Sequence, residues 1–74
     1  MVFENIRNLR EDNDKTQQEI ADYLNIKQTT YSKYELGKIN IPIEVFIKLA
    51  EYYDVSVDYL LGRSKNKIED RRFL

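Results

Sequence analysis

Apolar residues recur along the chain at the three- and four-residue spacing of an amphipathic helix, and no stretch alternates with period two for long enough to form a strand. The first apolar stripe contains Phe3, Ile6 and Leu9 and ends in the polar segment EDNDK. The next stripe, Ile20 to Leu24, follows the sequence TQQE. Similar spacing continues through most of the chain, so the pattern predicts an all-helical protein.

The helix predicted at 17–24 has clear start and stop signals. Thr16 can cap its first turn while Glu19 reaches back to the backbone of Thr16, the reciprocal arrangement called a capping box. Asn25 is expected to end the helix, because asparagine tolerates the left-handed backbone conformation better than other non-glycine residues. The segment LNI is therefore predicted to be a sharp turn between two helices.

The helix predicted at 28–36, within KQTTYSKYELGK, has an unusual polar face. It ends at Gly37 and points Tyr31 and Tyr34 inward. Its other face carries short hydroxyl and amide side chains instead of the long charged ones that favour a solvated helix. These groups make directional hydrogen bonds, so this face is a candidate binding surface. A merely solvated face is the alternative.

Two more helices and a tail complete the predicted organisation. One helix carries Pro42 in its first turn, and its expected core stripe is Ile43, Phe46, Leu49, Ala50 and Tyr53. The last helix, in DVSVDYLLG, is capped at Ser56 and ended by Gly62. The final segment, RSKNKIEDRRFL, has five basic and two acidic residues and forms a compositionally separate tail.

Length and composition narrow the possible function classes. With 74 residues, the chain makes one small domain. It has no cysteine and no histidine, which excludes disulfides, thiol nucleophiles, imidazole bases and the usual zinc sites; we expect no metal and no cofactor. It also lacks the apolar run of a membrane span or secretory signal, so a cytoplasmic protein is expected.

The capped helix at 17–24, the short turn and the helix with a free polar face follow the pattern of a helix-turn-helix, and the small residue Ala21 lies where two such helices would cross. Through TQQEIADYL, TTYSKYELGK and IPIEVFIKLAEYYDVSVDYLLG, residues 3–62 resemble the Cro and phage-repressor helix-turn-helix family, also called the xenobiotic-response-element type. The resemblance implies a five-helix repressor-like DNA-binding domain at 1–62. The basic tail at 63–74 lies outside the resemblance and is expected either to support a dimer or to be disordered. In that family, the second helix of the motif enters the major groove of operator DNA.

The polar face of the helix at 28–36 is accordingly predicted to read base edges. Gln28 can pair bidentately with adenine, and Thr29 offers a hydroxyl and a methyl group that suit thymine. Lys33 can reach the acceptors of guanine or a phosphate. Ser32 lies on the same stripe of the helix.

Contacts with DNA phosphates are expected at three further positions. Gln17 begins a helix whose unpaired N–H groups and positive dipole end attract phosphate. Lys27 precedes the helix at 28–36, and Lys38 follows it where the resemblance places a phosphate contact. These lysines matter more than the net charge of −1 and the pI near 5.4, because charges are screened beyond about 8 to 10 Å in physiological salt.

The resemblance also suggests that Arg10 and Glu35 form a partly buried ion pair between the first helix and the end of the helix at 28–36. Such a pair contributes little net stability but is costly to break on one side. A catalytic role for Glu35 is disfavoured because no base, metal ligand or nucleophile accompanies it. We therefore expect that the protein is not an enzyme.

The implied function is a sequence-specific transcriptional regulator, a repressor, that binds a palindromic operator as a homodimer. Tyr52, Tyr53, Tyr59 and the tail are the expected dimer interface. The alternative is a protein-interaction module of the same fold, such as an antitoxin or the target of a protein inducer or antirepressor. In that case the apolar residues of the tail, Ile68, Phe73 and Leu74, would contact the partner.

Overall fold

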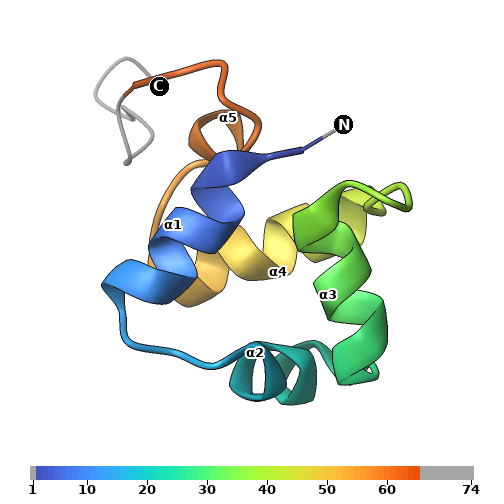
Figure 1. Cartoon of the computed structure of the whole chain (residues 1–74). Coiled ribbons are helices and arrows are strands. Elements are labelled where there is room, and N and C mark those ends of the chain that lie inside the picture. The colour runs from blue at the N-terminus through green and yellow to red at the C-terminus, as the bar shows by residue number, and fades with distance from the viewer. Residues whose placement is uncertain (1, 66–74) are drawn as a thin grey trace.

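The computed structural model describes residues 2–65, which form five α-helices and no strand (Figure 1). The helices are α1 (Glu4–Asp12), α2 (Gln17–Leu24), α3 (Gln28–Leu36), α4 (Ile43–Tyr53) and α5 (Val57–Leu60). In Figure 1, α4 crosses the middle of the molecule, with α1 and α5 above it, α2 below it and α3 to the right. The predicted all-helical, five-helix fold is confirmed.

Most of the predicted tail lies outside the described residues. Ile68, Phe73 and Leu74, the apolar residues of the tail, lie outside the described residues. Within residues 2–65, none of the helices has the length and apolar character needed to cross a membrane.

The local signals of α2 act as the sequence predicts. The Thr16 side-chain oxygen accepts a hydrogen bond from the Glu19 N–H at 3.1 Å, and the Glu19 carboxylate accepts one from the Thr16 N–H at 3.0 Å. At the other end Asn25 is left-handed, with φ of 60°, and the next residue, Ile26, donates its N–H to the carbonyl of Ala21 at 3.0 Å. This turn redirects the chain into α3 within three residues.

The same left-handed turn ends α3 and α4. Gly37 follows α3 with φ of 71°, a backbone region in which glycine avoids the Cβ clash of other residues. Asp54 follows α4 with φ of 56°. The sequence pattern had marked Gly37 but not Asp54, since aspartate is a weaker signal for this conformation.

One hydrophobic core joins all five helices. Ala21 is fully buried, which allows the backbones of α2 and α3 to approach closely. The rings of Phe3 and Phe46 meet edge to face with centroids 5.1 Å apart, and the Asn5 side-chain amide donates to the Tyr59 carbonyl at 2.6 Å, which ties α1 to α5. The buried apolar residues are Ile6, Leu9, Ile20, Ala21, Leu24, Tyr31, Tyr34, Phe46, Leu49, Ala50 and Leu60.

The predicted core stripe of α4 is wrong at one position. Ile43 is 56% exposed, whereas the other members of the stripe are buried or half-buried. Ile41 and Val45 pack against the core at this end of α4 instead. Since Ile43 lies between them, its side chain is left on the outer surface.

Candidate nucleic-acid interface

The helix α3 separates its tyrosines from its small polar side chains. Tyr31 is fully buried and Tyr34 nearly so, and both anchor α3 in the core. The predicted base-reading residues lie on the rest of the helix surface: Thr29 and Lys33 are exposed, and Gln28 and Ser32 are partly exposed. The structure thus brings these four side chains to the accessible side of one helix.

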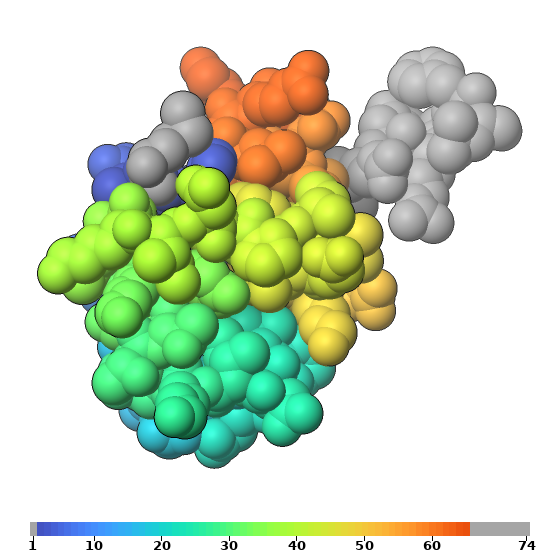
Figure 2. Space-filling view, turned by 90° about the vertical axis from the view of Figure 1, so that its right-hand side faces the viewer, coloured from blue at the N-terminus to red at the C-terminus, as the bar shows by residue number. Residues whose placement is uncertain are grey.

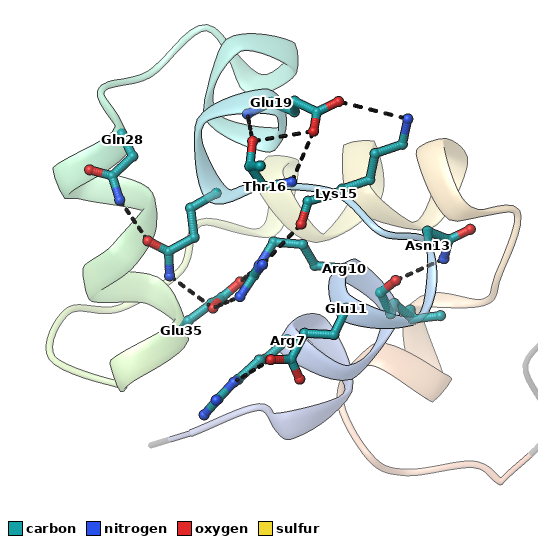
Figure 3. Close-up of polar contacts among 11 residues, drawn as sticks. Arg7, Arg10, Glu11, Asn13, Lys15, Thr16, Glu19, Gln28 and Glu35 are labelled. Atoms are coloured by element: carbon teal, nitrogen blue, oxygen red, sulfur yellow. Dashed lines mark hydrogen bonds and ion pairs between the residues drawn. The ribbon is translucent and has the colours of Figure 1, made fainter.

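The side chains of Gln28 and Gln17 are hydrogen-bonded to each other, although the sequence predicts a base contact for Gln28 and a phosphate contact for Gln17. The Gln28 amide nitrogen donates to the Gln17 side-chain oxygen at 2.6 Å. The Gln17 amide nitrogen in turn donates to a carboxylate oxygen of Glu35 at 3.1 Å. Figure 3 shows these contacts as a continuous series running from Gln28 to Glu35.

The carboxylate at one end sets the direction of every hydrogen bond in this series. An ionised carboxylate only accepts, so Gln17 must present its NH₂ group to Glu35 and its oxygen to Gln28. Gln28 must then use one N–H for Gln17. Its carbonyl oxygen and second N–H remain for another partner, and one acceptor beside one donor is the combination that pairs with adenine in the major groove.

Arg10 holds Glu35 from the other side. Its Nε donates to one carboxylate oxygen at 2.7 Å and a terminal nitrogen donates to the other at 3.1 Å. A further guanidinium nitrogen donates to the Lys15 carbonyl at 3.0 Å. The Arg10 and Glu35 side chains are only 14% and 4% exposed, so this ion pair joins α1, the segment before α2 and the end of α3 in a largely dry environment.

The ion pair keeps Glu35 charged. Burial by itself would raise the pKa of the Glu35 carboxyl, but the hydrogen bonds from Arg10, and further ones including that from Gln17, outweigh burial and hold the pKa below its ordinary value. Nearby Tyr31 behaves oppositely: burial, with the neighbouring carboxylate of Glu35, raises the pKa of its hydroxyl. Glu35 is therefore a fixed anion that orients Gln17.

The residues predicted to contact phosphate lie around α3 and at the start of α2. Lys27 and Lys38 are exposed and flank the two ends of α3. Gln17 is the first residue of α2, and the first-turn N–H groups of a helix have no partner within it. Leu36 and Ile39, on either side of Lys38, are also exposed, at 57% and 40%.

The connection between Gln17, Gln28 and Glu35 is not apparent from the sequence. These residues are separated by 11 and 18 positions along the chain. Two glutamines at the beginnings of consecutive predicted helices are the only sequence signal of the contact, and such a signal becomes meaningful once the angle between the helices is known.

The capped α2, the left-handed turn at Asn25 and the outward polar face of α3 together define a helix-turn-helix domain. A family model described as "Helix-turn-helix" matches residues 6–60, and the chain belongs to this family, with relatives of the Cro and phage-repressor type. Relatives in this family are named as HTH-type transcriptional regulators and phage repressors, which are not enzymes, and the prediction that this domain is not an enzyme is confirmed.

Curated relatives support the assignment. The chain is 39% identical over 69 residues to "Uncharacterized HTH-type transcriptional regulator YqaE" of Bacillus subtilis (strain 168), covering 92% of this chain and 60% of the relative. It is 38% identical over 62 residues to the cryptic phage CTXphi transcriptional repressor RstR of Vibrio cholerae, covering 84% and 55%. It is 32% identical over 72 residues to the antitoxin PezA of Streptococcus pneumoniae, covering 95% and 46%.

A solved structure agrees with the same family. The crystal structure of a transcriptional regulator from Listeria innocua matches with a TM-score of 0.77 and 31% sequence identity, covering 90% of this chain and 63% of that chain. The chain thus spans about three-fifths or less of the length of each of these proteins. The likeness concerns the helix-turn-helix domain.

Proposed function

We propose that residues 1–62 form the operator-binding domain of a transcriptional repressor and place α3 in the major groove of double-stranded DNA. The observation that carries this proposal is the orientation of Gln28. Gln17 occupies one of its amide hydrogens, which leaves an acceptor and a donor side by side at the start of α3. In this function Gln28 reads adenine, while Thr29, Ser32 and Lys33 contact neighbouring base edges.

The phosphate contacts in this proposal surround the reading helix. The first-turn N–H groups at Gln17 hold one phosphate, and Lys27 and Lys38 hold others at the two ends of α3. The acidic residues do not oppose this arrangement, because many of them belong to the end of α1 or to α4 and α5. Their field is screened within about 8 to 10 Å in physiological salt.

The proposal includes a homodimer on a palindromic operator, acting in the cytoplasm. The helix α3 of one domain, its recognition helix, reads only a few base pairs. A two-fold pair of helix-turn-helix domains doubles the contacts with DNA. In the same proposal, the tail at 63–74 supports dimerisation more than it contacts phosphate. A protein inducer or antirepressor is the further partner that such a repressor would have.

One comparison favours a second candidate function. The likeness to the antitoxin PezA covers 95% of this chain, so the domain also fits the DNA-binding or interaction part of an antitoxin. In that function a toxin would be the protein partner. The two candidates share the reading helix and differ in what binds the rest of the protein.

The experiment that tests the proposal distinguishes residues that contact base edges from residues that contact phosphates. DNA sites are first selected from random sequence, and binding of variants is then measured by fluorescence anisotropy at several salt concentrations. Gln28→Ala should lose about 1 to 3 kcal/mol on the selected site and relax the base preference at one position per half-site. Lys38→Ala should weaken all DNA alike and reduce the salt slope by roughly 0.9.

The matched control is Asn8→Ala, an exposed amide on α1, which should change neither quantity. Circular dichroism should show the wild-type fold for all three variants, because none of these side chains is in the core. The proposal fails if Gln28→Ala and Lys38→Ala weaken selected and random DNA by the same factor.

A further inference from the structure

Exposed apolar side chains gather on the outer face of α4. Ile43 and Ile47, one helical turn apart, are 56% and 44% exposed, and Tyr23 at the end of α2 is 42% exposed. Large apolar side chains grouped in this way commonly mark an interaction site on a small protein. We call this region the α4 surface and define it by Tyr23, Ile43, Glu44, Ile47, Lys48 and Glu51.

A groove runs along the α4 surface. One hollow of about 410 Å³ is lined by Tyr23, Glu44, Ile47, Lys48 and Glu51. A second, of about 300 Å³, shares Ile47 and Glu51 and continues toward Val55 and Val57. In Figure 2 the teal end of α2 and the yellow part of α4, which border the first hollow, lie side by side.

Tyr23 is held rigidly at the edge of this groove. Its hydroxyl donates to the carbonyl of Lys48 at 3.2 Å, and its ring lies against Tyr52 with centroids 4.6 Å apart. An exposed aromatic ring that is already fixed loses little conformational freedom when a partner covers it. Such aromatic anchors carry much of the binding energy at protein interfaces.

The charges of the α4 surface are arranged to match a copy of themselves. Glu44 and Lys48 are one helical turn apart and lie beside Ile47, on the same side of it around α4. If two α4 helices cross in opposite directions about an axis midway between these residues, each Glu44 lies opposite the partner's Lys48. The two copies of Ile47 then lie close to the axis, beside these two pairs of opposite charges.

We propose that a second copy of this chain docks on the α4 surface through such a two-fold contact, an inference that rests on the proposed function and names its dimer interface. Figure 2 shows α3, in green, and part of α4, in yellow, on the same side of the molecule. A contact beside α3 lets both recognition helices approach one DNA duplex. By contrast Tyr52, Tyr53 and Tyr59 are partly buried against the chain's own core, which leaves less of their apolar area for a partner.

Sedimentation equilibrium of the full chain without DNA tests the surface directly. Ile47→Asp should weaken self-association at least about tenfold, because a charge would be buried at the centre of the contact. The control is Val2→Asp, which places the same charge at a residue that is 53% exposed and outside the α4 surface. Association of the control should equal that of the wild type.

Charge exchange tests the two-fold pairing. Glu44→Lys and Lys48→Glu should each weaken association, because each creates like charges across the axis. The double variant Glu44→Lys with Lys48→Glu has the wild-type net charge and should recover most of the loss. Recovery requires residue 44 of one copy to face residue 48 of the other, so a double variant as weak as the singles would overturn the two-fold arrangement.

DNA binding separates this inference from the proposed function. Ile47→Asp should bind a single half-site with the wild-type affinity and lose the additional affinity for the palindrome. If Ile47→Asp associates like the wild type, or if the wild type stays monomeric up to about 1 mM, the α4 surface is not the dimer interface. Loss of base preference in Gln28→Ala would still support the proposed function in that case.

Discussion

At the scale of single residues, the central feature is a fixed anion, Glu35, buried near the C-terminal end of the reading helix α3. Glu35 accepts hydrogen bonds from Arg10 on one side and from Gln17 on the other. Because Gln17 cannot rotate its amide without losing that contact, Gln28 is held in one orientation as well. A side chain held before binding loses less conformational freedom when it meets a base.

This arrangement gives a prediction for pH. The pKa of Glu35 lies below its ordinary value of 4.5, so the stabilisation from its charge is complete above that pH and is lost as the pH falls through the folded-state pKa. Glu35→Gln should therefore lower the free energy of unfolding by about 1.5 to 3 kcal/mol at neutral pH. The difference between wild type and variant should shrink as the pH falls below 4.5 and through the lower folded-state pKa of Glu35.

Urea unfolding at a series of pH values measures this difference. The matched control is Glu11→Gln, which removes a carboxylate from an exposed pair with Arg7 at 3.4 Å. Solvent screens that pair, so the control should differ little from wild type at any pH. A constant difference between Glu35→Gln and wild type across the series would contradict the assigned role of the charge.

At the scale of elements, short helices are defined by their ends. The helix α2 has eight residues and α5 only four, lengths at which an isolated helix is not stable in water. Side-chain caps and left-handed turns satisfy the unpaired groups at these ends. They also set the directions in which consecutive helices leave one another, which brings α3 to the surface beside α2.

Removal of the cap on α2 tests this view. Thr16→Ala deletes the side-chain oxygen that accepts from the Glu19 N–H at 3.1 Å, and it should lower the free energy of unfolding by about 1 kcal/mol. Thermal unfolding followed by circular dichroism measures the change. Thr29→Ala, an exposed hydroxyl on α3, is the control and should have no comparable effect. Equal stability of Thr16→Ala and wild type would show that packing alone fixes the start of α2.

At the scale of the whole molecule, one small domain offers two different surfaces. The polar outer side of α3 carries Gln28, Thr29, Ser32 and Lys33. The α4 surface carries the exposed side chains of Tyr23, Ile43 and Ile47 together with neighbouring charges. In the proposed assembly the first surface meets DNA and the second meets another copy. Together they determine which spacing of half-sites two domains can occupy.

The assembly predicts a spacing rule. A palindrome with half-site centres about 34 to 36 Å apart, one turn of DNA, should bind more tightly than an isolated half-site. Insertion of about half a helical turn between the half-sites should remove that advantage, since the second recognition helix would face the wrong side of the duplex. Electrophoretic mobility shift with the three DNAs measures this. Equal affinity for a half-site and the palindrome would contradict dimeric binding.

The sequence by itself determined that the chain is helical, and it determined where α2 begins and where α2 and α3 end. Thr16 with Glu19, Asn25 and Gly37 mark the ends of α2 and α3 at the residues where the structure has them. These signals can be recognised in the sequence because each interaction spans four residues or fewer, so all the residues that form it are close together along the chain. The same segments resemble the helix-turn-helix family, so the family and its five-helix fold could be inferred from the sequence.

Only the tertiary structure decided what the side chains of different helices do to one another. The hydrogen bonds from Gln28 to Gln17 and from Gln17 to Glu35 depend on the angle at which α2 and α3 cross. Ile43 points outward because Ile41 and Val45 pack against the core at this end of α4. Helical periodicity fixes the face to which a residue belongs, but whether that face meets protein or water is set by the packing of elements far apart in the chain.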